Sequence, residues 1–219
     1  KETSCVRCSN TGIIGSPSLH DSMDDNDEEH DEVLVRVGPH DAQVYNCNRC
    51  FKPNVSQKFF FQECGLTGLL DSAIGGYRAC AFAFGQTGAG KTYTIVGPGN
   101  APTPGTDDDG ILGSSLSYLF RKLEALGVEF TLRLSCMEIY KEQVYDLLAS
   151  GADRKVPLNV REHAQDGFFC ENTTMMPCQN LENATHALDV AMQYRRLGGH
   201  DMNSRSNRSH CLTDIFIEL

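Results

Sequence analysis

The alternation of apolar and polar residues predicts an ordered region of mixed strands and helices that begins near residue 33. The pattern predicts strands over residues 33–37, 43–51, 79–84, 128–140, 156–161, 167–171 and 210–219. It predicts helices over residues 57–74, interrupted at its glycines, and over 91–96, 111–126, 142–148 and 181–197. Strands and helices that alternate in this way favour an α/β domain with a mixed sheet flanked by helices.

Residues 1–32 lack such a pattern and differ in charge from the rest of the chain. They hold 9 of the 29 acidic residues but only 2 of the 19 basic ones, and eight acids lie within residues 21–32. Like charges repel and this segment has little apolar surface to bury, so we expect a disordered acidic segment over residues 1–32. The ordered domain is then expected over residues 33–219, and a docking role for the acidic segment is the alternative.

Charge, apolar runs and cysteine content limit the kinds of partner and cellular location that we expect for this protein. The net charge of −10 comes mostly from the acidic segment, and no basic stripe is present, so we expect no nucleic-acid partner. The sequence has no apolar run long enough to span a membrane, and no secretory signal is recognisable. Ten cysteines without such a signal predict reduced thiols in the cytoplasm. The two Cys-x-x-Cys pairs, at residues 5–8 and 47–50, are too far apart for usual zinc spacing, and we interpret them as coincidental.

The strongest chemical signal is a glycine-rich loop that satisfies the pattern G-x-x-x-x-G-K-S/T. Its residues are Gly85, Gln86, Thr87, Gly88, Ala89, Gly90, Lys91 and Thr92. Glycines let the backbone N–H groups surround phosphate oxygens, and the following helix adds the positive end of its dipole. Lys91 is expected to contact the outer phosphates, and the Thr92 hydroxyl to bind Mg²⁺. The predicted strand before the loop and helix after it supply the context that this motif requires.

Residues 84–94 resemble more than a general phosphate loop, because they follow the kinesin motor family's G-Q-T-G-x-G-K-T and its next residues. Three other blocks occur in that family's order. Residues 35–39 resemble its first strand, residues 138–148 match E-I-Y-x-E-x-V-x-D-L-L, and residues 203–210 resemble switch I, N-x-x-S-S-R-S-H. The resemblance covers residues 33–219. It implies a P-loop NTPase fold of kinesin motor type that is incomplete at the C-terminal side.

The resemblance also implies a set of site residues. Arg36 and Pro39 match positions beside the adenine, and Tyr93 follows the loop in the nucleotide site. Ser206, Asn207 and Arg208 match the part of switch I that senses the γ-phosphate. The implied cofactors are ATP and Mg²⁺, and the implied partner of the full motor is the microtubule, which places the protein in the cytoplasm on the cytoskeleton. We interpret residues 138–148 as structural core.

Two departures from the family pattern affect the expected activity. Asn207 stands where the family has a serine, and an amide cannot reproduce the hydrogen bond of a hydroxyl without rearrangement. The switch II motif D-x-A-G-x-E does not occur in the sequence, and the main microtubule-binding elements of the family follow that motif. By this resemblance, strands of the central sheet are missing, so we expect unpaired edges and exposed apolar faces.

The residues therefore leave three functions open. The first is a microtubule motor that hydrolyses ATP. The second is a truncated kinesin-like protein that binds nucleotide without productive hydrolysis and acts through protein interactions. The third is an unrelated P-loop kinase of small molecules with Arg195 and Arg196 on a lid, which the three other kinesin-like blocks disfavour. Direction of movement, cargo and oligomeric state are not encoded in these motifs.

Overall fold

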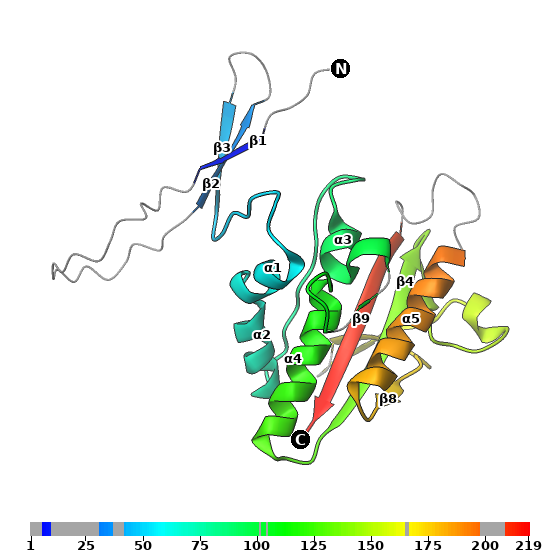
Figure 1. Ribbon diagram of the computed structural model, residues 1–219. Helices are drawn as coiled ribbons and strands as arrows, with labels where there is room; N and C mark the ends of the chain where they lie inside the picture. Colours follow the sequence, from blue (N-terminus) through cyan, green and yellow to red (C-terminus); the bar gives the residue numbers. More distant parts are fainter. Residues whose placement is uncertain are drawn as a thin grey trace. The chain divides into compact units, whose positions relative to one another are not determined.

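The computed structural model describes residues 6–9, 31–36, 42–100, 102–103, 105–164, 167–197 and 209–219. The chain divides into two compact units, residues 1–55 and residues 56–219. Figure 1 labels the helices and strands of each unit.

The first unit contains a three-stranded antiparallel sheet in the order β1-β2-β3. Its strands are β1 (Val6–Ser9), β2 (Asp31–Arg36) and β3 (Ala42–Cys47). Strands β2 and β3 confirm the strands predicted after residue 33. Strand β1 and the start of β2 fall within the segment expected to be disordered, whereas the rest of residues 1–32 lies outside the described residues. The division at residue 32 therefore stays a prediction.

The second unit begins with four helices that follow the predicted pattern closely. They are α1 (Gln57–Glu63), α2 (Leu66–Ile74), α3 (Lys91–Val96) and α4 (Ile111–Leu126). The predicted helix over residues 57–74 breaks once, at Gly65, whose φ of 80° is left-handed backbone that glycine adopts readily. Helix α4 ends as expected at Gly127, which is also left-handed and donates its N–H to the carbonyl of Glu124.

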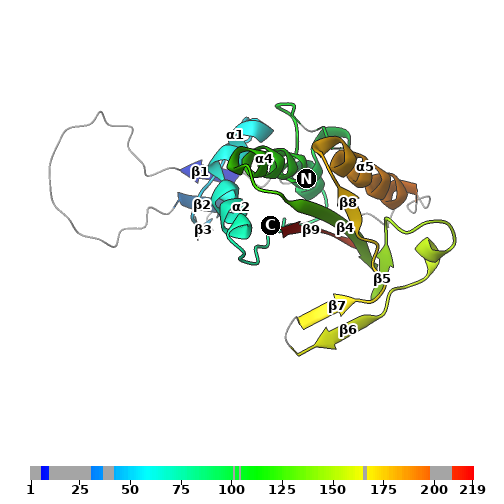
Figure 2. The ribbon, with the colours of Figure 1, turned by 90° about the horizontal axis from the view of Figure 1, so that it is seen from below.

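Strand β4 (Thr131–Tyr140) organises the sheet of this unit, and all its pairings are antiparallel. Strand β9 (Ser209–Glu218) lies along one edge of β4 over its full length. Along the other edge, β8 (Met176–Cys178) pairs with the first half of β4 and β5 (Gln143–Asp146) with its second half. A separate hairpin of β6 (Val160–His163) and β7 (Gly167–Cys170) projects from the sheet (Figure 2).

The core of this unit forms where α4 and α5 (Leu181–Leu197) cover one face of the sheet, as Figure 2 shows. The buried side chains come at helical spacing from both helices and at alternate positions from β4. They include Leu116, Leu119, Leu132, Leu134, Cys136, Ala184 and Leu188, each at most 1% exposed. Helices α1 and α2 add Phe61, Leu66 and Leu70 against α4. This core includes α2, the helix that precedes the glycine-rich loop in the sequence.

One predicted element, the helix over residues 142–148, is wrong. Residues 143–146 form β5 and return along β4 through a turn at Lys141 and Glu142, whose φ angles are 49° and 64°. Positive φ angles at both central residues are typical of a type I′ turn, one of the two common two-residue hairpin turns. The apolar spacing of this block suits a helix as well as a strand, and the pairing with β4 decides between them.

The strand predicted over residues 79–84 is also wrong. These residues are irregular and none pairs with a strand in the described part of the chain. Phe82 and Phe84 are 81% and 94% exposed, so the segment is not buried. A strand needs hydrogen bonds from a neighbouring strand, and the described residues do not provide that neighbour here.

Candidate functional site

The glycine-rich loop of residues 85–90 has the backbone shape that its sequence predicts. Gly85, Gly88 and Gly90 have φ angles of 153°, 81° and 90°, which residues other than glycine rarely adopt. At Gly85 a Cβ atom would also lie only 3.1 Å from the Cβ of Ala89, so the loop closes tightly on itself. The Ala89 N–H donates to the Gln86 carbonyl at 3.1 Å and fixes this turn. The loop thus presents an exposed, curved backbone, as phosphate binding requires.

The side chain of Lys91 folds back onto the start of this loop. Its Nζ donates to the carbonyl oxygens of Gly85 and Gln86, both at 2.8 Å. The side chain is half-buried, and these two bonds place its positive charge against the start of the loop. A charged donor at this place can interact with an anion that the loop holds.

Helix α3 follows the loop directly, which confirms the helix expected there. Gly90 is its N-cap and has no side chain that could cap the first turn. The N–H groups of that turn are therefore available to a ligand or to solvent. Thr92 is half-buried in the same turn and Tyr93 is 53% exposed. The donor set of glycine loop, Lys91 and Thr92 hydroxyl fits a nucleotide phosphate with Mg²⁺.

Five other residues are predicted for the site: Arg36, Pro39, Ser206, Asn207 and Arg208. Arg36 lies at the end of β2 in the first unit. Pro39 lies outside the described residues, as do Ser206, Asn207 and Arg208. The predicted roles of these five residues stay predictions.

Two polar residues near α3 were missed by the sequence reasoning. Gln57, the first residue of α1, is only 5% exposed, and its Nε2 donates to the Tyr93 carbonyl at 2.6 Å. Asp109, at the end of the connection from α3 to α4, is 2% exposed and accepts a hydrogen bond from the Thr103 N–H at 3.1 Å. Burial raises the pKa of Asp109 to about 6, although the backbone N–H groups of Thr103 and Gly110 oppose that shift.

No periodic pattern marks either residue. Gln57 is followed by a second polar residue, Lys58, in the first turn of α1, and Asp109 follows two other aspartates in a polar loop. Contacts with distant residues accompany their burial: Gln57 bonds to Tyr93 of α3, and Asp109 lies against Gly113 of α4.

A cavity of about 450 Å³ lies between α1, α2 and the loop region. Its lining includes Phe60, Leu66, Leu69, Phe82, Ala89 and Lys91. Because this lining is mostly apolar, it is a poor place for charged phosphates. We therefore place the phosphate contacts at the exposed backbone of the loop.

Residues 138–148 are predicted to be structural core, and several of them are buried. Leu147 and Leu148 are buried, at 4% and 8% exposure. Asp146 is 1% exposed, and its carboxylate accepts hydrogen bonds from the N–H groups of Leu148, Ala149 and Thr174, at 2.8, 3.1 and 2.7 Å. A buried carboxylate with three such donors fastens β5 to the chain before β8.

No described helix is long and apolar enough to cross a membrane. Within the same residues, no three His, Cys, Asp or Glu side chains gather as metal ligands.

Comparisons with known proteins agree with this geometry. Residues 3–219 match the family model described as "Kinesin motor domain". Kinesin-like protein KIF12 of Mus musculus is 37% identical over 166 residues, which make up 74% of this chain and 25% of the mouse protein. Carboxy-terminal kinesin 2 of Xenopus laevis is 34% identical over 180 residues, 80% of this chain and 27% of the frog protein. The chain therefore spans about a quarter of the length of these relatives.

A solved structure of a fast kinesin superposes with a TM-score of 0.75 at 26% identity, over 85% of this chain and 51% of that one. This likeness confirms the predicted fold class, an α/β P-loop fold of kinesin motor type.

Proposed function

The chain belongs to the kinesin motor domain family, and on that premise we propose that it binds ATP with Mg²⁺ through its glycine-rich loop and hydrolyses it as part of a microtubule motor. The observation that carries this proposal is the loop itself, with three left-handed glycines that lead into α3 at Lys91. Family membership supports microtubules as the partner and the cytoskeleton as the location. The part matched by this chain is 25% of the mouse relative and 27% of the frog relative, so the activity of a whole motor is part of the proposal.

The backbone of the loop and the side chains of Lys91 and Thr92 have different roles in the proposed site. The backbone N–H groups of the loop and of the first turn of α3 hold the phosphate oxygens. Lys91 exchanges the carbonyls of Gly85 and Gln86 for the outer phosphates, and the Thr92 hydroxyl holds Mg²⁺. Mg²⁺, when bound, neutralises the phosphate charge. Ser206, Asn207 and Arg208 act as the γ-phosphate sensor, Arg36 and Pro39 lie beside the adenine, and Tyr93 follows the loop in the nucleotide site.

Binding of a fluorescent ADP to the 219-residue chain in Mg²⁺ buffer tests this proposal. Saturable binding that Lys91→Ala abolishes supports it. Lys122→Ala is the matched control, because Lys122 is an exposed lysine on α4 that pairs with Asp71. Absence of binding by the wild-type chain, or equal binding by Lys91→Ala, would contradict it.

A second function is favoured by one residue of the sequence: Asn207, which replaces the switch I serine. On this alternative the protein binds nucleotide without productive hydrolysis and acts through protein interactions. Single-turnover hydrolysis in the complete motor domain separates the two functions. If Asn207 limits hydrolysis, Asn207→Ser raises the rate, whereas an unchanged rate argues against any effect of this residue.

A further inference from the structure

We propose that Gln57 is a positioning residue for the phosphate-binding loop, and that its side-chain amide fixes the helix on which Lys91 and Thr92 sit. The contact that leads to this inference joins two segments 36 residues apart, because Gln57 Nε2 donates to the Tyr93 carbonyl at 2.6 Å. The inference rests on the proposed nucleotide binding of that loop.

The donor belongs to a rigid element. The Ser56 side chain caps α1 by accepting the Phe59 N–H at 3.2 Å, which fixes the first turn that carries Gln57. One turn later, Phe61 is 8% exposed in the core and packs edge-on against Tyr118 of α4, with ring centroids 6.3 Å apart. The amide of Gln57 is thus held by the core and by the cap.

The acceptor belongs to an element that needs support. Helix α3 has only six residues, and a helix of that length is marginal without tertiary contacts. The Tyr93 carbonyl already accepts the Gly97 N–H at 3.0 Å, and the amide of Gln57 adds the second bond that a carbonyl oxygen can take. Tyr93 directly follows Thr92, so a displacement of this carbonyl displaces the Lys91 and Thr92 side chains as well. Displacements of about 1 Å are enough to weaken a polar site substantially.

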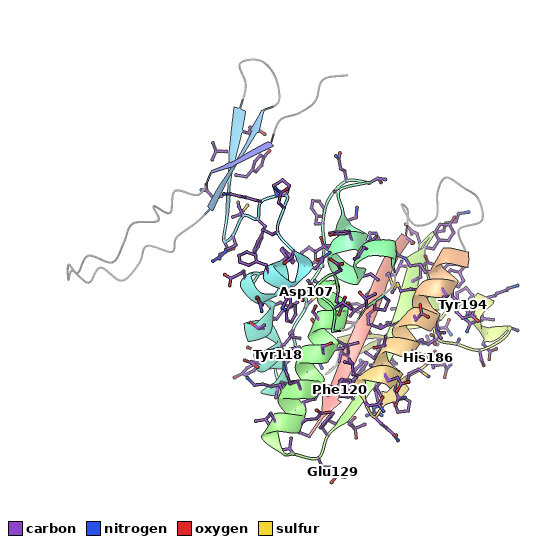
Figure 3. The ribbon with its side chains drawn as sticks, in the orientation of Figure 1. Asp107, Tyr118, Phe120, Glu129, His186 and Tyr194 are labelled. Carbon is purple, nitrogen blue, oxygen red and sulfur yellow. The ribbon has the colours of Figure 1, made fainter. Side chains whose placement is uncertain are left out.

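The next residue of α1 provides a natural control. Lys58 Nζ pairs with Asp107 at 2.9 Å, and both side chains are more than half exposed, at 59% and 74%. Figure 3 marks Asp107, which belongs to the connection between α3 and α4. Exposed pairs of this kind contribute little to stability, so Lys58→Ala changes α1 at the adjacent position without removing the contact to α3.

The variant Gln57→Leu tests the proposal, because leucine fills a similar space and has no donor. The measurement is the dissociation constant of fluorescent ADP, with Mg²⁺ and with EDTA, at a temperature where circular dichroism shows each variant folded. We expect Gln57→Leu to weaken binding in Mg²⁺ roughly three- to tenfold, the worth of one net hydrogen bond. We also expect a smaller gain in affinity from Mg²⁺, because Thr92 no longer sits correctly, and Lys58→Ala should bind as the wild type does.

A different result is expected if Gln57 only stabilises the fold and does not position the loop. In that case the variant would bind equally well, or would lose affinity by the same factor with and without Mg²⁺ in step with its lower unfolding temperature. Either result overturns the proposal while leaving nucleotide binding intact. If the wild-type chain itself binds no ADP, the proposed function of the loop fails and this inference falls with it.

Discussion

The buried carboxyl of Asp109 makes stability depend on pH in a direction opposite to that of most protein carboxylates. Asp109 is 2% exposed, and burial raises its pKa from 3.8 to about 6. A Cβ atom at Gly113 would overlap the carboxyl group of Asp109, so this carboxyl packs directly on the first turn of α4. Between pH 4 and pH 6 the folded protein keeps a proton on this group that the unfolded chain has released.

The magnitude follows from the gap between the two pKa values. A gap of about two pKa units corresponds to about 3 kcal/mol at 1.36 kcal/mol per unit. Because the native state binds more protons in this window, the free energy of unfolding falls as pH rises from about 4 to about 6. Above pH 6 this group is ionised in both states, and its contribution no longer changes.

The substitution Asp109→Asn removes this titration and keeps the shape of the side chain. From urea unfolding at pH 4.5 and pH 7.5, we expect the stability of the variant relative to wild type to improve by about 2 kcal/mol at the higher pH. Asp108→Asn, at an exposed neighbouring position, controls for the loss of one negative charge. If the difference between Asp109→Asn and wild type were the same at both pH values, the reasoning would be refuted.

Two further predictions concern the core and the exposed segment before the loop. Leu188 of α5 is 0% exposed, so Leu188→Ala should lower the free energy of unfolding by about 3 kcal/mol. Leu126 is 52% exposed, and Leu126→Ala should lower it by less than about 1 kcal/mol. Equal losses of stability in urea unfolding would contradict this prediction. Phe82 and Phe84 are the exposed aromatic residues of an apolar run, so we expect the chain to self-associate and the double variant Phe82→Ser, Phe84→Ser to do so less. Sedimentation velocity measures this, and a monomeric wild-type chain at the same concentration would count against it.

Elements with complete local signals could be predicted from the sequence. The bounds of α4 follow from its apolar spacing and from Gly127, which ends the helix whatever packs against it. The loop of residues 85–90 could likewise be predicted, since its glycines dictate its backbone. In both cases the residues that determine the conformation are those of the element itself.

Elements that depend on distant partners could not be predicted in this way. Residues 143–146 became a strand because β4 offers them hydrogen bonds, and their spacing alone does not reveal that partner. Residues 79–84 have strand-forming composition but no described strand pairs with them. The burial of Gln57 depends on where α3 lies, which no pattern within α1 specifies.

The two carbonyl contacts of Lys91 have a consequence for how fast the proposed site would exchange its ligand. Gly85 and Gln86 give the ammonium group acceptors within the loop itself, at 2.8 Å each. A departing phosphate therefore does not leave a desolvated cation behind, because the lysine can transfer its hydrogen bonds to these carbonyls as the phosphate withdraws. The same carbonyls compete with an arriving phosphate and reduce its net gain. If the loop binds nucleotide as proposed, these carbonyls weaken phosphate binding and lower the barrier to release, which favours repeated turnover.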